Sequence, residues 1–496
     1  MFTHYDHLGF ANPYYTEVDG RFIIRFKFPD ILAEFGCNRV LDEVAVVEIL
    51  NKNYCFADRT LVRDVRRTPW MARPNPENRL WDYSPLPRHG NRKLPVEEIA
   101  QILLNKICEE VRGYIRGRRR IGILLSGGMD SRIVAGALDL VLKSGTEQKS
   151  EVTALTWGMP GSRDVVYARE IALAMGWCWK HYEVLAKDLG NNISESALHG
   201  CEYSPVHLHG IPQIRDDNDF DVVLAGSYGD SVGRAEFSGK RILDVKPLGL
   251  NIYNVGLMLS PNVFNACRIS AMDDLCAYHA IYAREQKYMQ NELDYQLHYM
   301  RRMLNPCMEL IQEKMSFHQV FTDPAVFGFM WSIDPALRTN EVYACLLKQF
   351  SSDLRKIPWS RTGLPYPETE GKPDEYKRIN SNYIQLIVGE LYPDISDRAM
   401  SDEISRLGIF NMRSIKALLV LIKKLPVQNI YYYERMAWIA SLAEMVNKYG
   451  IEAKRTKSDS SLANMVNAAG ATCSYMKKYA RSLAASAIGK ARSAHG

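Results

Sequence analysis

The fold is decided by one stretch of sequence, Ile121-Gly-Ile-Leu-Leu-Ser-Gly-Gly-Met-Asp-Ser-Arg132. Its first five residues are apolar or glycine, which is typical of a short buried strand. A Gly-Gly turn follows, and the residues from about 131 to 142 then fit a helix. A strand that passes through a tight turn into a helix is the repeating unit of a parallel sheet with helical connections.

The same alternation continues farther along the chain. Val152 to Trp157 predicts a second strand, Val165 to Met175 a second helix, and Asp221 to Ala225 a third, apolar strand. After about residue 257, helical periodicity dominates to about residue 446. We therefore expect an α/β fold with a doubly wound, mainly parallel sheet, followed by a helix-rich C-terminal half.

The region before this sheet predicts simpler elements. Residues 21–28 alternate between charged and apolar side chains, which predicts a half-buried strand that ends at Pro29. The apolar face of that strand would hold Phe22, Ile24, Phe26 and Phe28. An amphipathic helix is expected from Val96 to Ile115, with its apolar face at Ile99, Leu103, Ile107, Val111 and Ile115.

The composition is that of a globular protein of roughly two to four domains. The 496 residues are 47% hydrophobic and 24% charged, so disorder is not expected. The formal charge of +5 comes from the end of the chain, because residues 451–496 hold eight basic and two acidic residues. The remaining body is close to neutral, so a nucleic-acid partner is not predicted.

We expect a cytoplasmic protein. The N-terminus lacks the basic stretch and apolar core of a signal peptide. The most apolar short run, residues 417–422, is far below the roughly 20 residues that cross a bilayer. The ten cysteines include no C-x-x-C pair, which argues against zinc ribbons and thioredoxin-like sites and fits reduced thiols.

The Gly-Gly turn has the chemistry of a phosphate-binding loop. It directs backbone N–H groups and the start of a helix at one spot, and its glycines let phosphate oxygens approach the main chain. Ser126 and Ser131 add hydroxyl groups, whereas Asp130 would repel a phosphate unless Mg²⁺ lies between them. The alternative is a plain strand-to-helix turn. Neither a Walker loop nor a Rossmann fingerprint is present here.

The string Ser-Gly-Gly-x-Asp-Ser after an apolar strand resembles the pyrophosphate loop of the PP-loop ATP pyrophosphatases, which have the adenine nucleotide alpha hydrolase-like topology. The resemblance implies ATP and Mg²⁺ as cofactors, cleavage of ATP between its α and β phosphates, and adenylation of the substrate. Later segments are each weaker but occur in the order of the asparagine-synthetase branch. They are residues 58–67, 156–164, 222–231, 320–338 and 357–363.

The resemblance to asparagine synthetases also implies roles for single residues. Asp130 and Asp230 would bind Mg²⁺. The same two aspartates and Arg361 would carry catalysis, with Arg361 stabilising charge on the leaving pyrophosphate. The nucleotide would contact Leu125, Ser126, Gly127, Gly128, Asp130, Ser131, Trp157, Ala225 and Gly226. Simpler alternatives are a core residue for Leu125, a loop-capping residue for Asp230 and a surface arginine for Arg361.

Departures from the family pattern bear on the function. The chain begins with Met1-Phe2 and its first cysteine is Cys37, so about 40 residues stand where a glutaminase domain would begin with a catalytic cysteine. Ser227 and Ser231 replace the two glutamates of the family's G-E-G-x-D-E loop, and Arg361 replaces a lysine. The resemblance then implies an AMP-forming carbon–nitrogen ligase without a working glutaminase, whose substrate is not aspartate.

The reactants stay broad at this point. The carboxylate would belong to a small molecule, a glycan precursor or a peptide. The amine would be free ammonia, ammonia from a separate glutaminase, or an amine on the substrate itself. Two alternatives stay open, namely a catalytically inactive scaffold that binds ATP and another PP-loop enzyme such as a tRNA-modifying ligase.

Four segments are expected along the chain: a residual or replaced N-terminal segment at 1–40, an ATP-binding α/β domain with its entry segment at 41–257, a helical part at 258–446, and a basic extension at 447–496. In the extension, Tyr475, Tyr479 and Leu483 recur every four residues among basic side chains. This pattern fits a helix on an anionic membrane surface or acidic carrier, or else a solvated extension. Tyr228 is interpreted as a packed loop residue, with a part in the acyl-transfer step as the alternative. His207 and His209 are interpreted as surface or core histidines, with a shared ligand on one face of a strand as the alternative.

Overall fold

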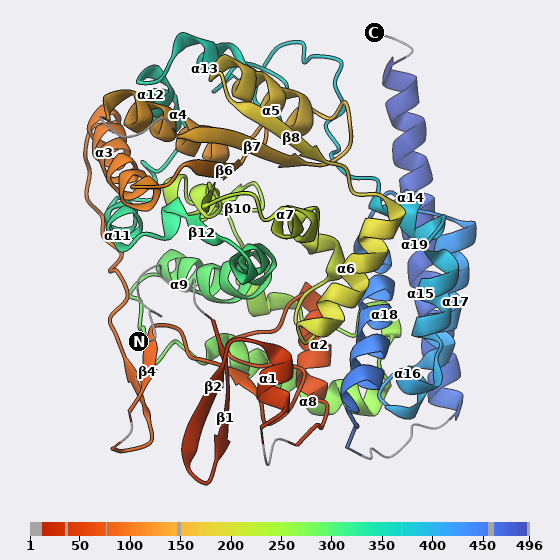
Figure 1. The fold of residues 1–496 in the computed structure, drawn as a ribbon. Helices are drawn as coiled ribbons and strands as arrows, with labels where there is room; N and C mark the ends of the chain where they lie inside the picture. The colour runs from red at the N-terminus through yellow and green to blue at the C-terminus, as the bar shows by residue number, and fades with distance from the viewer. Residues whose placement is uncertain are drawn as a thin grey trace.

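The computed structural model describes residues 12–34, 38–75, 77–145, 150–368, 370–454 and 461–493, so Met1, Phe2 and Cys37 lie outside the described residues. At its centre is a five-stranded parallel sheet in the order β12-β9-β6-β7-β8 (Figure 1). The strands are β6 (Arg120–Leu124), β7 (Glu151–Trp157), β8 (Cys178–Tyr182), β9 (Val222–Ala225) and β12 (Ser316–Gln319). The predicted α/β class and parallel sheet are confirmed.

Three helices cover the sheet, and they bury the faces that their sequences predict. They are α3 (Val96–Ile115), α4 (Met129–Ser144) and α5 (Arg163–Ala174). All five residues of the expected apolar face of α3 are buried, and α3 packs against α4. α5 packs along β7 and β8. Burial of these apolar faces is what holds the sheet and its helices together.

Two strands of the sheet were not predicted, and both are polar. β8 reads Cys-Trp-Lys-His-Tyr and is mostly half-buried at one edge of the sheet. β12 reads Ser-Phe-His-Gln and forms the other edge, although His318 and Gln319 are fully buried. A short polar segment gives no period-two apolar signal, so neither strand stands out from the helices around it.

The N-terminal region corrects one prediction. β1 (Tyr14–Val18) pairs with β2 (Arg21–Arg25), and the strand ends there instead of continuing to Pro29. Phe28 begins the short helix α1 (Phe28–Leu32), in which Pro29 occupies the first turn, where a missing N–H costs nothing. Phe26 is 64% exposed whereas Phe28 is fully buried, so the four residues do not share one face.

The second hydrophobic core is helical, and it joins distant parts of the chain. Its central helix is α18 (Tyr431–Tyr449), which packs against α6 (Ala186–Leu198) and α15 (Tyr392–Ala399), while α2 (Glu43–Lys52) belongs to the same core (Figure 1). The other helices of the molecule are α7 (Ile211–Asp217), α8 (Pro261–Cys276), α9 (Lys287–Asp294), α10 (Asn305–Glu309), α11 (Pro324–Ser332), α12 (Asn340–Lys348), α13 (Ser352–Lys356), α14 (Tyr383–Val388), α16 (Asp402–Arg406) and α17 (Met412–Lys424). The cores do not follow chain order, and the expected segment boundaries remain predictions.

The basic C-terminal extension forms one long helix, α19 (Ser461–Ser493). Its first half packs against α17, where Tyr475 is fully buried and donates its hydroxyl hydrogen to the Leu425 carbonyl at 2.8 Å. A wholly solvated extension is therefore wrong for this half. Farther on, Leu483 is 54% exposed and the helix runs past the body of the protein (Figure 1). Among the described residues, no helix is both long enough and apolar enough to cross a membrane.

Candidate active site

The turn after β6 is held by its own side chains and by close neighbours. The Ser126 hydroxyl accepts a hydrogen bond from the Gly128 amide at 3.1 Å and lies 3.2 Å from the Ser131 hydroxyl. A Cβ atom at Gly127 would lie 2.9 Å from the backbone oxygen of Arg163, so the turn needs glycine at that position. These contacts fix the turn as a cradle at the start of α4.

The N-terminus of α4 carries no cap. Its N-cap residue is Gly128, which has no side chain to accept a hydrogen bond. Within the described residues, no acceptor bonds the backbone amides of Met129 and Asp130. The first turn of a helix directs such amides and the positive end of the helix dipole at one point. An anion placed there would be bound by the backbone.

A cleft of about 300 Å³ opens beside this turn, at the carboxyl ends of β6, β7 and β9. Ligands of open α/β sheets bind at this edge. The cleft is lined by Leu124, Leu125, Ser126, Gly128, Asp130, Ser131, Trp157, Asp164, His209, Gly226, Ser227, Met308 and Asn380.

Seven of the predicted site residues line this cleft: Leu125, Ser126, Gly128, Asp130, Ser131, Trp157 and Gly226. Four do not line it. Gly127 has both backbone groups bonded to other residues of the protein, and Ala225 is buried at the end of β9. Asp230 and Arg361 lie next to Asp130 in a cluster of charged side chains. The roles expected for all these residues remain predictions.

The loop after β9 approaches α4 so closely that it needs glycine twice. A Cβ atom at Gly226 would lie 2.6 Å from the amide nitrogen of Ser131, and one at Gly229 would lie 2.5 Å from the Cβ atom of Asp130. No pair of atoms can stay this close without a shift of the backbone. The two glycines therefore set how near the loop that bears Asp230 comes to Asp130.

Three carboxylates share two arginines next to the turn. The Nη2 atom of Arg234 lies 2.8 Å from an oxygen of Asp230 and 3.4 Å from an oxygen of Asp130. Arg361 donates to Glu236 at 2.9 Å and lies 4.0 Å from Asp230. The side chain of Arg234 is 2% exposed, whereas those of Asp230 and Arg361 are 38% and 33% exposed, so the cluster is buried around Arg234 and open to solvent around Arg361. Arg234 was not found from the sequence, because nothing in the local pattern marks it.

The two aspartates have opposite pKa shifts. Burial raises the pKa of Asp130 well above its usual range, and the charge of Asp230 raises it further. Burial acts on Asp230 in the same direction, but the neighbouring carboxyl group of Asp130 and the charges of Arg234 and Arg361 outweigh it and lower its pKa. Two carboxylates that share a site with one arginine between them titrate as a pair. Without a further cation, the pair favours a proton on Asp130.

A long connection from residue 357 to residue 382 walls the cleft. Arg132 of α4 is buried and donates to the carbonyls of Ile357 and Pro358, at 2.6 and 2.8 Å. The Ser360 amide donates to the Gly127 carbonyl at 3.1 Å. These bonds join the connection to the glycine turn, which brings Arg361 beside the turn.

Five cleft residues were missed by sequence reasoning: Leu124, Asp164, His209, Met308 and Asn380. The His209 ring stacks near Trp157 and Tyr383 and bonds the Tyr383 hydroxyl at 2.7 Å. Burial lowers the pKa of His209 to about 3, so the imidazole is neutral. Its φ of 49°, unusual outside glycine, is the type of strain found at functional sites, but it cannot be read from a sequence.

The two serines that replace family glutamates have different surroundings. Ser227 lines the cleft, whereas Ser231 is 1% exposed and donates its hydroxyl hydrogen to the Tyr228 carbonyl at 3.1 Å. Tyr228 is buried, as expected for a packed loop residue. Only the change at position 227 therefore alters the wall that a ligand would meet.

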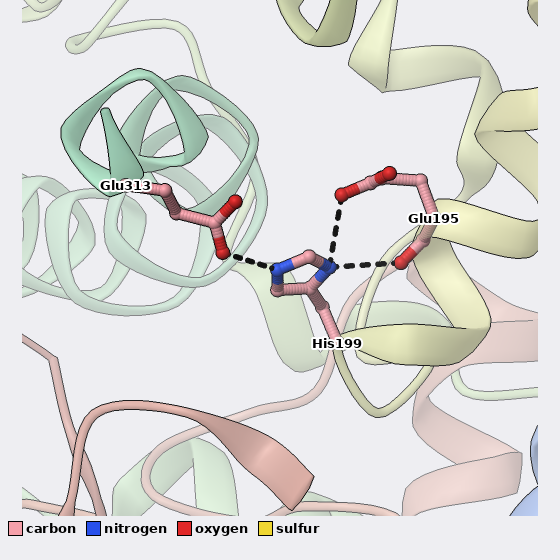
Figure 2. A group of neighbouring side chains, drawn as sticks. All are labelled: Glu195, His199 and Glu313. Carbon is pink, nitrogen blue, oxygen red and sulfur yellow. Dashed lines mark hydrogen bonds and ion pairs between the residues drawn. The ribbon is translucent and has the colours of Figure 1, made fainter. Parts of the chain in front are cut away.

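A second group of metal-ligating side chains lies on α6 and the segment before β12. Figure 2 shows His199 between Glu195 and Glu313, with its ring 2.9 Å from Glu313. Arg215 binds Glu195 and lies 2.9 Å from Glu313. Because an arginine already neutralises both carboxylates, this group is an ion-pair network and not a vacant set of metal ligands.

Comparison with known proteins places the glycine turn and the β9 loop in one known domain. Residues 104–235 match the family model described as Asparagine synthase. The chain carries an asparagine synthase domain. This domain contains β6, β7, β8 and β9. Of the charged cluster it contains Asp130, Asp230 and Arg234, whereas Glu236 and Arg361 lie outside it. The recognition made from the glycine turn is thereby confirmed, and it implies a family of ATP pyrophosphatases and ligases.

Two curated proteins are similar to part of the chain. The amidase chyE of Penicillium rubens is 26% identical over 161 residues, which cover 31% of this chain and 23% of that protein. A probable glutamine-hydrolysing asparagine synthetase of Acanthamoeba polyphaga mimivirus is 26% identical over 145 residues, which cover 28% of this chain and 26% of that protein. The chain thus spans about a quarter of the length of these relatives.

One solved structure is similar to part of the chain. It is the U34-tRNA thiolase NcsA from Methanococcus maripaludis, with 13% identity and a TM-score of 0.22. The likeness covers 46% of this chain and 90% of that one. We base no conclusion on a TM-score this low.

The residues of the cleft fit a magnesium nucleotide. The uncapped start of α4 suits a phosphate, and the two serines of the turn add hydroxyl groups. The Oδ1 atom of Asp130 is buried with no hydrogen-bond partner, which is costly unless a ligand completes its surroundings. Carboxylate oxygens are ligands that Mg²⁺ prefers, usually together with substrate phosphates. Asp130 is therefore the residue best placed to hold the metal.

Proposed function

We propose that the protein is an ATP-dependent, AMP-forming ligase that adenylates a substrate carboxylate and passes it to ammonia or another amine. The observation that carries this proposal is the glycine turn at the uncapped start of α4, which opens on a cleft within the asparagine synthase domain. A helix N-terminus of this type binds phosphate. Asp130 beside it calls for a cation if a phosphate is to approach.

In this proposal the chain supplies binding and charge, and no side chain acts as a covalent nucleophile. The first amides of α4 and the Ser126 hydroxyl would hold phosphate oxygens, and the Trp157 ring would border the nucleoside. Arg361 would stabilise the charge that develops on the leaving pyrophosphate. Asp130 would hold Mg²⁺, which neutralises phosphate charge when bound. Alignment of the carboxylate with the α-phosphorus would give an acyl-adenylate, and attack of the amine would release AMP.

The residues that line the cleft bear on the class of substrate that we propose. Ser227 faces the cleft where the asparagine-synthetase pattern has a glutamate, so the proposed substrate is not aspartate. A small-molecule, glycan or peptide carboxylate remains the proposed class. The nitrogen would come from free ammonia, from a separate glutaminase or from an amine on the substrate.

A second candidate function is an ATP-binding scaffold without activity. It is favoured by one observation, namely that Arg234 already contacts both aspartates of the cluster. An arginine in that place competes with a metal ion for the carboxylates. The scaffold would bind nucleotide but release no pyrophosphate with any carboxylate.

Pyrophosphate release tests the proposal. The protein with MgATP is offered small acids, sugar acids and peptides, and release is expected with one class. Asp130→Asn should lower the rate by at least about 100-fold, because the metal loses its carboxylate. The matched control is Asp139→Asn on the same helix, where the carboxylate pairs with Lys143 at 2.7 Å. Wild-type rates in Asp130→Asn would overturn the proposal, and nucleotide binding without release would favour the scaffold.

A further inference from the structure

Arg234 is held as firmly as any residue of the cluster. It follows a one-turn helical segment, Gly229–Gly233, and its backbone amide donates to the Asp230 carbonyl at 3.2 Å. Its guanidinium lies 5.1 Å from the centre of the Tyr343 ring and 5.5 Å from that of Trp359. The Nη1 atom donates to Asn340 at 3.2 Å. A cation with this many partners keeps its place when one partner is lost.

The bonds from Arg234 to the two aspartates are unequal. Charge-assisted N–H···O bonds are usually about 2.7–2.9 Å long. The contact with Asp230, at 2.8 Å, has this length, whereas the contact with Asp130, at 3.4 Å, is stretched. Release of Asp130 would therefore cost Arg234 little, while release of Asp230 would cost it its best bond.

The free oxygen atoms are unequal as well. One oxygen of Asp230 is bonded to Arg234 and the other lies 4.0 Å from the guanidinium of Arg361. The Oδ1 atom of Asp130 has no hydrogen-bond partner, and Asp130 lines the cleft whereas Asp230 does not. A metal ion beside Asp230 would face two guanidinium groups, but a metal ion beside Asp130 would meet one unpaired oxygen.

We infer that, of the two aspartates, Asp130 binds the metal and Asp230 does not, because Arg234 positions Asp230 as a partner of the two arginines instead. This inference rests on the proposed function and changes the expectation that both aspartates bind Mg²⁺. Arg234 is then a positioning residue. It holds Asp130 by one weak bond that the metal displaces, and it retains Asp230, Asn340 and the two rings in both states.

Binding of Mn²⁺, measured by electron paramagnetic resonance with and without ATP on the full chain, tests the inference. Asp130→Asn should weaken Mn²⁺ binding in the presence of ATP by at least about 10-fold, and Asp230→Asn by less than about 3-fold. Arg234→Gln should free Asp230 to serve as a ligand. The double variant Asp130→Asn, Arg234→Gln should therefore recover part of the affinity that Asp130→Asn loses.

Equal losses in the two asparagine variants would overturn the inference, as would no recovery in a folded double variant. Thermal unfolding of each protein identifies a variant that does not fold. If Arg234→Gln fails that check, the comparison of Asp130→Asn with Asp230→Asn decides alone, and Arg234→Lys, which keeps the charge, should leave Mn²⁺ binding near the wild-type value. Absence of Mn²⁺–ATP binding by the wild-type protein would instead remove the proposed function and this inference with it.

Discussion

Two charged clusters of this protein have similar compositions and leave different groups unpaired. Beside the glycine turn, Arg234 and Arg361 face Asp130, Asp230 and Glu236. In the other cluster, Arg215 lies among Glu195, Asp216 and Glu313. His199 completes the group and lies between Glu195 and Glu313 (Figure 2). Both clusters contain three carboxylates in contact with arginine, so the number of acidic groups alone does not distinguish them.

The difference lies in what remains unsatisfied. In the cluster of Arg215 every carboxylate faces arginine or histidine. Beside the turn, the Oδ1 atom of Asp130 has no hydrogen-bond partner and the first amides of α4 are free within the described residues. Unpaired buried groups cost free energy, so they persist where a ligand satisfies them. This contrast predicts that substitutions beside the glycine turn will affect ligand binding, and that substitutions in the cluster of Arg215 will affect stability.

The largest effect is expected from Gly226→Ala. The new Cβ atom would lie 2.6 Å from the backbone of Asp130 and Ser131, so the β9 loop or the start of α4 must move. We expect a loss of pyrophosphate release of about 100-fold or more, because misplacement by about 1 Å is enough for that. Gly113→Ala is the control, since its Cβ atom meets nothing within 4 Å in the last turn of α3. It should raise the unfolding temperature slightly, and activity of Gly226→Ala near the wild-type rate would break the comparison.

Arg215→Ala is expected to lower stability and to leave nucleotide binding unchanged. Loss of Arg215 leaves Glu195 and Glu313 near each other without a cation. Because Glu313 is 31% exposed, the loss of unfolding free energy should be about 2 kcal/mol, below the range for fully buried pairs. Calorimetry measures it, and Lys314→Ala, which removes an exposed pair with Asp216, is the control. A loss of nucleotide binding in folded Arg215→Ala would contradict the assignment of this cluster to stability.

A smaller effect is expected on the pH dependence of stability, to which Glu309 and Glu313 contribute in opposite directions. Burial raises the pKa of Glu309 to about 8, whereas a hydrogen bond from His199 lowers the pKa of Glu313. The contribution of Glu309 to stability is thus complete below its unfolded pKa of 4.5 and is lost as the pH rises through about 8. The contribution of Glu313 is present above its unfolded pKa and is lost as the pH falls.

Glu309→Gln keeps the neutral form at every pH. Between pH 5 and pH 9, the free energy of unfolding of the wild type should therefore fall relative to this variant, by an amount on the order of 1 kcal/mol for a half-buried group. Glu313→Gln should show its largest deficit above pH 5. Parallel pH curves for the wild type and Glu309→Gln, measured by urea unfolding, would show that Glu309 is ionised in the folded protein.

The smallest effect concerns the end of α19. Tyr475 is buried against α17, so a truncation before it would damage the core, and the shortened variant should end at Ser482 instead. The removed part carries exposed Leu483 and the basic residues Lys490 and Arg492. If this part lies on anionic membranes, the full chain should sediment weakly with anionic vesicles at low salt and the shortened one should not. Equal sedimentation would leave the end of α19 as a plain extension, with activity unchanged in either case.

The sequence predicts those parts of the fold whose pattern is local. The apolar run before the Gly-Gly turn identifies β6, and the spacing of apolar residues gives the whole of α3. β12 was missed because two of its three buried residues are histidine and glutamine, so its four residues give no alternating apolar signal. The end of β2 was misplaced because Pro29 can begin a helix as well as end a strand.

The candidate site also has one part that the sequence predicts and one part that it does not. Residues of the glycine turn are consecutive, so their common location follows from the sequence. Arg234, His209 and Asn380 come from other segments, and only the folded chain brings them to the turn. The sequence favours a structural role for His209, because it and His207 lack a nearby pattern of cysteines or carboxylates. Charged residues of ordinary spacing carry no mark of the partners that they will meet.

The parallel pairing of β12 with β9 has a practical consequence for anyone who wishes to isolate the asparagine synthase domain. Residues 104–235 end shortly after β9, and the strand that protects its outer side is supplied only at Ser316–Gln319. Excised alone, this segment would present the unpaired N–H and C=O groups of a fully buried, apolar edge strand to other chains. We expect such a fragment to aggregate when it is expressed, whereas a fragment that continues past β12 restores the missing partner.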